Sequence, residues 1–76
     1  MNRTAQILAA ADAAIARADA VTAAQVGKAQ TDAMYVAQWT ADEEAMRACR
    51  AAARLQQPEW VRAQYRASAS FFASQI

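Results

Sequence analysis

Residues 40–60 read TADEEAMRACRAAARLQQPEW and contain the clearest helix boundaries in the sequence. Thr40 and Glu43 have the spacing of a capping box, in which the Thr oxygen accepts a backbone N–H and the Glu reaches back to the capping residue. Three acids fall in the turn that follows Thr40, where the helix dipole favours negative charge. Pro58 suits the first turn of another helix, because its missing N–H would be unpaired there in any case. The stretch therefore predicts helices over residues 41–56 and 58–75.

Upstream of Thr40, small and apolar residues recur every three or four positions, which is the α-helical period. These positions are Thr4, Leu8, Ala11, Ile15, Ala18, Thr22, Val26, Ala29, Ala33 and Val36. The stripe favours a single helix over residues 4–38, which would be roughly 50 Å long at 1.5 Å per residue. A break near residue 22 is the alternative, because Thr22 and Gln25 also have the spacing of a capping box.

Length and periodicity predict a single all-α domain over residues 1–76, with three helices, or four if the first one breaks. Hydrophobic residues make up 57% of the chain, but 24 of them are alanines, which favour helix and bury little area. Only 17 large apolar side chains remain beyond Met1, and five of these lie in the first 33 residues. We therefore expect a helical bundle or hairpin that partner chains complete, and not a stable monomer.

The cysteine content and the distribution of apolar residues bear on the compartment. Cys49 is the single cysteine, so no disulfide can form within the chain and a reducing compartment is expected. Asp12 interrupts the apolar start of the chain, which argues against a secretory signal. No apolar run approaches the roughly 20 residues of a membrane helix. The expected location is intracellular or within a virion, without secretion and without a transmembrane segment.

The sequence offers few residues for catalysis or metal binding. Histidine is absent, so Cys49 has no imidazole base, and its place between Met46 and Ala52 is typical of a structural thiol. One cysteine and a single run of acids do not provide the clustered ligands of a metal site. One glycine cannot form a phosphate-binding loop. We expect no enzyme activity, no metal and no cofactor.

Arginine is concentrated between Arg47 and Arg66, where five arginines accompany one glutamate. With Trp60 and Tyr65 nearby, this segment has the residue types that bind single-stranded nucleic acid by charge and stacking. The whole chain, however, has a net charge of only +1, whereas nucleic-acid domains are strongly basic. Arginine also pairs with carboxylates at protein interfaces. Protein is therefore the expected partner, as further copies of the chain or a larger assembly, and nucleic acid is less favoured.

Two groups of residues form the predicted interface. Small side chains of the N-terminal stripe let another helix approach closely, either within the chain or in a second copy. Aromatic residues near the C-terminus either meet in a small core or anchor the chain on a partner. The candidate interface residues are Ala11, Ile15, Ala18, Val26, Ala29, Arg50, Arg54, Trp60, Tyr65, Phe71, Phe72 and Ile76.

Residues 49–76 have a Pro-Glu-Trp helix start followed by a helix of Arg, Gln and aromatic residues. This segment resembles the second half of phasin-type proteins, which coat polymer granules, and the resemblance implies a surface-coat role. The Ala- and Gln-rich composition is also similar to that of small bacteriophage virion and accessory proteins. The leading prediction is a non-enzymatic, multi-copy structural or assembly component of a larger complex such as a bacteriophage particle. The alternatives are a small inhibitor or adaptor that docks on a bacterial or host enzyme, and a phasin-like coat.

Overall fold

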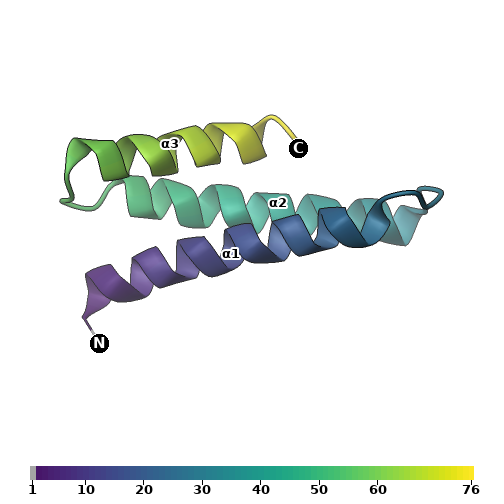
Figure 1. The fold of residues 1–76 in the computed structure, drawn as a ribbon, viewed down its shortest axis with the longest axis horizontal. Coiled ribbons are helices and arrows are strands. Elements are labelled where there is room, and N and C mark those ends of the chain that lie inside the picture. Colours follow the sequence, from purple (N-terminus) through teal and green to yellow (C-terminus); the bar gives the residue numbers. More distant parts are fainter. Residues whose placement is uncertain (1) are drawn as a thin grey trace.

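The computed structural model describes residues 2–76, which form three α-helices and contain no strand. Helix α1 spans Arg3–Gln25, α2 spans Asp32–Ala53 and α3 spans Glu59–Ala73. Successive helices run in opposite directions and are joined by short turns (Figure 1). The predicted all-α class with three helices is confirmed.

The predicted boundary between the first two helices is wrong. The chain turns over residues 26–31, so the continuous helix over 4–38 does not form. Thr40, the predicted helix start, lies in the middle of α2, and Thr22, the alternative break, lies inside α1. The Thr22 hydroxyl is 3.1 Å from the Ala18 carbonyl oxygen, so it bonds back along its own helix instead of capping a new one.

Two local signals place the turn where it is. Gly27 has a φ of 77°, in the left-handed region that glycine enters without steric cost and that commonly follows a helix. The Thr31 hydroxyl accepts a hydrogen bond from the Met34 amide at 3.1 Å, which caps the start of α2. Asp32 follows in the first turn and matches the helix dipole.

The second turn agrees with the prediction from Pro58. This residue precedes α3 directly, and its carbonyl accepts hydrogen bonds from the Val61 and Arg62 amides at 3.0 and 3.2 Å. α2 ends at Ala53, three residues earlier than predicted. The short connection between α2 and α3 reverses the chain and sets α3 antiparallel to α2 (Figure 1).

Small side chains form most of the core. Seven buried residues line the contact between α1 and α2, and they recur at spacings of three and four, as in a coiled-coil seam. They are Ala11, Ala14, Ala18, Ala41, Ala45, Cys49 and Ala52. Such short side chains let the two helix backbones approach closely but bury little area each.

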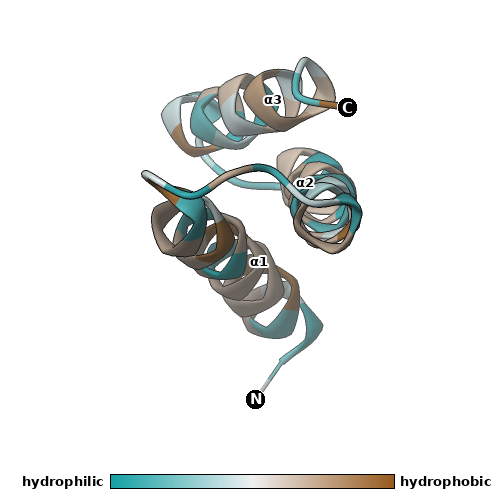
Figure 2. Cartoon of the chain, turned by 90° about the vertical axis from the view of Figure 1, so that its right-hand side faces the viewer, coloured by the Kyte–Doolittle hydropathy of each residue, from teal (hydrophilic) through white to brown (hydrophobic). Residues whose placement is uncertain are grey.

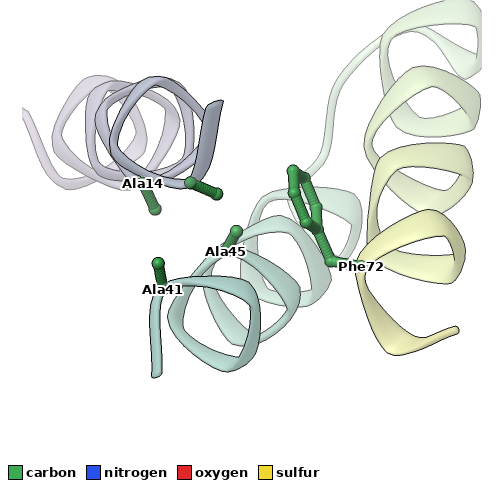
Figure 3. Close-up of a cluster of buried hydrophobic side chains, with 5 residues drawn as sticks. Ala14, Ala41, Ala45 and Phe72 are labelled. Atoms are coloured by element: carbon green, nitrogen blue, oxygen red, sulfur yellow. The ribbon is translucent and has the colours of Figure 1, made fainter. Parts of the chain in front are cut away.

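Phe72 fastens α3 to this pair of helices. It is 4% exposed and is the one large apolar residue within 2–76 that is buried. Its ring lies beside Ala45 of α2, and Ala14 of α1 faces Ala41 across the same cluster (Figure 3). A single phenylalanine therefore connects all three helices. One helical turn before Phe72, Ala69 of α3 belongs to a second cluster of buried residues around Cys49.

The molecule is elongated and open. Its extents are 42 × 25 × 16 Å, and its radius of gyration is 13.3 Å, against about 11 Å for a compact chain of this length. α1 and α3 each pack on α2, and along these described helices no Cα of α1 lies within 8 Å of a Cα of α3. Viewed end-on, α2 lies to one side of the other two helices (Figure 2). This arrangement leaves hollows between the helices.

Candidate interaction surfaces

The first hollow lies where α3 stops. α3 has 15 residues and α1 and α2 have 23 and 22, so the α1–α2 hairpin extends past the C-terminal end of α3 (Figure 1). A cavity of about 390 Å³ opens there, and we call it the acidic hollow. Its lining contains two acids and no base: Asp19, Thr22, Gln25, Gln30, Tyr35, Gln38, Trp39, Asp42, Phe71, Phe72 and Gln75.

A polar network forms part of the lining of the acidic hollow. The Gln38 side chain donates to the Asp42 carboxylate at 3.1 Å, and its carbonyl oxygen lies 3.0 Å from the Thr22 hydroxyl. Asp42 is buried, so this hydrogen bond replaces part of the hydration that its carboxylate loses. Gln25 of α1 donates to the Met34 carbonyl of α2 at 2.9 Å. These hydrogen bonds join α1 to α2 near the loop at residues 26–31, where polar residues replace the alanines of the contact.

Aromatic rings border the same hollow. Tyr35, Trp39 and Phe71 all line it and are exposed. The rings of Phe71 and Phe72 meet edge to face, with centroids 5.2 Å apart and planes at 81°, a favoured geometry for an aromatic pair. Two neighbouring residues thus diverge: Phe72 enters the core and Phe71 faces solvent. The predicted aromatic core forms only around Phe72.

The second hollow is a groove of about 590 Å³ between α2 and α3, which we call the arginine groove. Four arginines and four small residues line it, and no acid does: Arg50, Ala53, Arg54, Arg62, Arg66, Ala69, Ser70 and Ala73. Because the remaining lining residues are alanine and serine, the long arginine side chains dominate its surface.

The four arginines differ in their partners. Glu59 pairs with Arg66 and, at 3.7 Å, with Arg62. The Arg66 guanidinium, by its hydrogen bond and its charge, lowers the pKa of Glu59. Within residues 2–76, Arg50 and Arg54 form no ion pair. Both lie at the C-terminal end of α2, where the helix dipole favours positive charge, and they remain available to an acidic partner.

Tyr65 links the two outer helices. Its hydroxyl donates to the Asp12 carboxylate at 2.8 Å, which joins α3 to α1 across α2. Burial, with the hydrogen bond and charge of Asp12, raises the pKa of Tyr65 to about 12. The Asp12 side chain, itself exposed, thus holds a protonated phenol in a contact within the chain.

Cys49 lies at the centre of the second cluster, fully buried between Ala11 and Ala69. Burial, and secondarily the charge of Asp12, raises the pKa of the Cys49 thiol. The thiolate is the reactive form of cysteine, so both effects disfavour nucleophilic chemistry here. The structure places this thiol as a packing residue.

The structure distributes the predicted interface residues among several surroundings. Ala11, Ala18 and Phe72 belong to the chain's own core, so pairing within the chain accounts for the part of the alanine stripe that lies in α1. Ile15 and Tyr65 are half-buried against that core. The remaining residues are exposed: Val26, Ala29, Arg50, Arg54, Trp60, Phe71 and Ile76.

Sequence reasoning missed how residues combine at the two hollows. Tyr35 and Trp39 share a helix face, but they border the acidic hollow instead of filling a core. Gln38 and Asp19 belong to no sequence motif that would have indicated a site. Arg62 stood in the basic segment of the sequence, and only the antiparallel packing of α2 and α3 brings it beside Arg54.

Comparisons with known proteins found no match for this chain among protein-family models, curated proteins or solved structures. The resemblance to phasin-type proteins therefore stays a prediction. No helix within residues 2–76 is long and apolar enough to cross a membrane. In the same residues, no three Cys, Asp or Glu side chains are grouped as a metal site requires.

Proposed function

We propose that the protein acts by non-enzymatic contact with other proteins, as a multi-copy helical component that associates with further copies of itself. The observation that carries this proposal is the exposure of its large apolar residues. Of those within residues 2–76, seven are 41–75% exposed and Phe72 alone is buried. The seven are Val26, Tyr35, Val36, Trp39, Trp60, Phe71 and Ile76.

Physical chemistry explains why such a chain gains from a partner. Fully burying one large apolar side chain stabilises by about 1.5–3 kcal/mol. For Tyr35 the fold does not supply that burial, because α3 ends before it reaches the start of α2. Aromatic residues gathered around a hollow are typical of the central contacts of protein interfaces.

The finer version of the proposal is a structural or assembly component of a larger complex, such as a bacteriophage particle, inside a cell or within the virion. The small size and the Ala- and Gln-rich helical composition support it. The alternative is an adaptor or inhibitor that docks on a single enzyme. Trp60 favours that alternative, because it is exposed at the start of α3 and lines neither hollow.

Light scattering over a range of concentrations tests the proposal. The wild-type chain should have a mass above 8.2 kDa that rises with concentration. Phe71→Ser should lower that mass while circular dichroism retains its helical signal. Ala67→Ser, at an exposed position of α3 that lines neither hollow, is the control and should leave the mass unchanged. A wild-type chain that remains at 8.2 kDa throughout would overturn self-association.

A further inference from the structure

Charge is divided unequally along the chain. Residues 1–44 contain three basic and six acidic residues, a net charge of −3, whereas residues 45–76 contain five basic residues and one acid, a net charge of +4. In the folded chain, the two hollows also differ in the sign of their charge. The acidic hollow has Asp19 and Asp42 and no base, and the arginine groove has four arginines and no acid.

One copy of the chain cannot bring these two surfaces together. Asp42 of the acidic hollow and Arg50 of the arginine groove lie eight residues apart along α2. At 1.5 Å per residue this is about 12 Å of helix. Charges separated by more than about 8–10 Å in solvent are largely screened at physiological salt. Neither surface therefore neutralises the other in a single copy, and Arg50 and Arg54 have no ion pair within residues 2–76.

Resting on the self-association proposed above, we infer that copies associate head to tail, with the arginine groove of one copy docked on the acidic hollow of the next. Arg50 and Arg54 supply guanidinium groups that have no ion pair within residues 2–76. The hollow offers the exposed Asp19 carboxylate and the faces of Tyr35, Trp39 and Phe71. Guanidinium groups pair with carboxylates and stack on aromatic faces, so arginine can bind both the carboxylate and the rings of the acidic hollow.

A second copy is the occupant that accounts for both surfaces. An acidic protein of another kind, or a nucleic acid, would neutralise the arginine groove and leave the acidic hollow with its aromatic border uncovered. An interface between two different patches is heterologous, and it generates closed rings or open filaments instead of a symmetric dimer. Such growth suits a component that is present in many copies.

A mixing experiment with two variants tests the inference. The groove variant carries Arg50→Glu and Arg54→Glu, and the hollow variant carries Asp19→Asn and Phe71→Ser. All four positions are exposed, and circular dichroism checks that each variant is as helical as the wild type. Each variant alone should remain at the monomer mass of 8.2 kDa in light scattering at low salt.

The mixture of the two variants should form a 1:1 complex of twice the monomer mass that does not grow further. Only the intact hollow of one variant and the intact groove of the other can meet in it. Arg3→Glu, an exposed reversal outside both surfaces, is the control and should assemble like the wild type. Added salt should lower the wild-type mass, because it screens the charges.

The outcomes separate the two proposals. If the wild type is oligomeric but the mixture stays monomeric, or if either variant alone keeps the wild-type mass, the head-to-tail arrangement is wrong and self-association stands. If the arginine groove binds only an acidic partner or a nucleic acid, the groove variant alone should keep the wild-type mass. If the wild type is monomeric at every concentration and salt, self-association itself fails.

Discussion

At the scale of single residues, the adjacent Phe71 and Phe72 have opposite roles. Phe72 is the one large apolar residue within residues 2–76 that is buried, so Phe72→Ala should cost about 3–5 kcal/mol, a large part of the 5–15 kcal/mol that typically stabilises a domain. We expect loss of the cooperative thermal transition followed by circular dichroism. Phe71→Ala, at a residue 58% exposed, is the control and should leave the monomer's own stability nearly unchanged. Equal losses for both variants would contradict the assigned core.

Tyr65 predicts a dependence of stability on alkaline pH. Its pKa is raised to about 12 in the folded chain, against about 10 in an unfolded one. Its contribution to stability is therefore complete below pH 10 and is lost as pH rises from about 10 to 12. A Tyr35→Phe background leaves Tyr65 as the sole phenol, and tyrosinate absorbance then follows its titration. A native midpoint equal to that in denaturant would show that the Asp12 contact has no effect.

The Cys49 thiol should react slowly while the chain is folded. It is fully buried and its pKa is raised, so the thiolate is both scarce and inaccessible. A disulfide-exchange reagent should therefore modify Cys49 only as fast as the helices open, and denaturant should restore fast labelling. Cys49→Ala should keep the oligomeric mass of the wild type. Rapid labelling of the native chain would show that this cluster is looser than the structure indicates.

At the scale of the helices, the sequence indicated one turn correctly and concealed the other. Pro58 cannot donate a backbone hydrogen bond, so it marks a boundary regardless of tertiary context. The first turn lies within a stripe whose period continues through Val26, Ala29 and Ala33, so periodicity alone predicted a continuous helix. Gly27 and the Thr31 cap were the available signals, but each is a single residue and the N3 position, Met34, does not complete a capping box.

Thr40 shows why a capping motif alone is weak evidence. Its predicted box partner, Glu43, pairs instead with Arg47 at 2.6 Å, one helical turn further on. Ala41 and Asp42 are buried in α2, so burial against the other helices carries the helix through the motif. The acidic hollow was hidden from sequence for a related reason. Its existence depends on how far α3 extends along α2, which composition does not specify.

Helix capping gives a direct test of this architecture. Thr31→Ala should cost about 1 kcal/mol of unfolding free energy, because it removes the oxygen that accepts the Met34 amide. Gly27→Ala should cost a similar amount of roughly 1–2 kcal/mol, because alanine disfavours a φ of 77° even though the space beside Gly27 is open. Thr40→Ala, in the middle of α2, is the control and should be nearly neutral. Urea unfolding measures all three, and a larger loss at Thr40 than at Thr31 would favour the boundary predicted from sequence.

At the scale of the whole molecule, we propose that a core of alanines makes stability dependent on association. The small side chains hold α1 and α2 close together but remove little apolar area from water, and seven large residues remain at the surface. The elongated shape, with a radius of gyration of 13.3 Å, increases the surface that a neighbour can cover. On the head-to-tail proposal, the segregation of charge would direct which surfaces meet.

This dependence predicts that the melting temperature rises with protein concentration. Because association stabilises only the folded form, a tenfold increase in concentration adds up to about 1.4 kcal/mol for each interface filled. For a domain of this size, 1 kcal/mol shifts the melting temperature by about 4–8 °C, so several degrees per tenfold step should be measurable by circular dichroism. Phe71→Ser should abolish the dependence, because it removes a ring from the acidic hollow. Trp60→Ser, at a residue 68% exposed but outside both hollows, should retain it. A wild-type melting temperature that is the same at all concentrations would instead mean that the alanine seam and Phe72 stabilise the monomer without a partner.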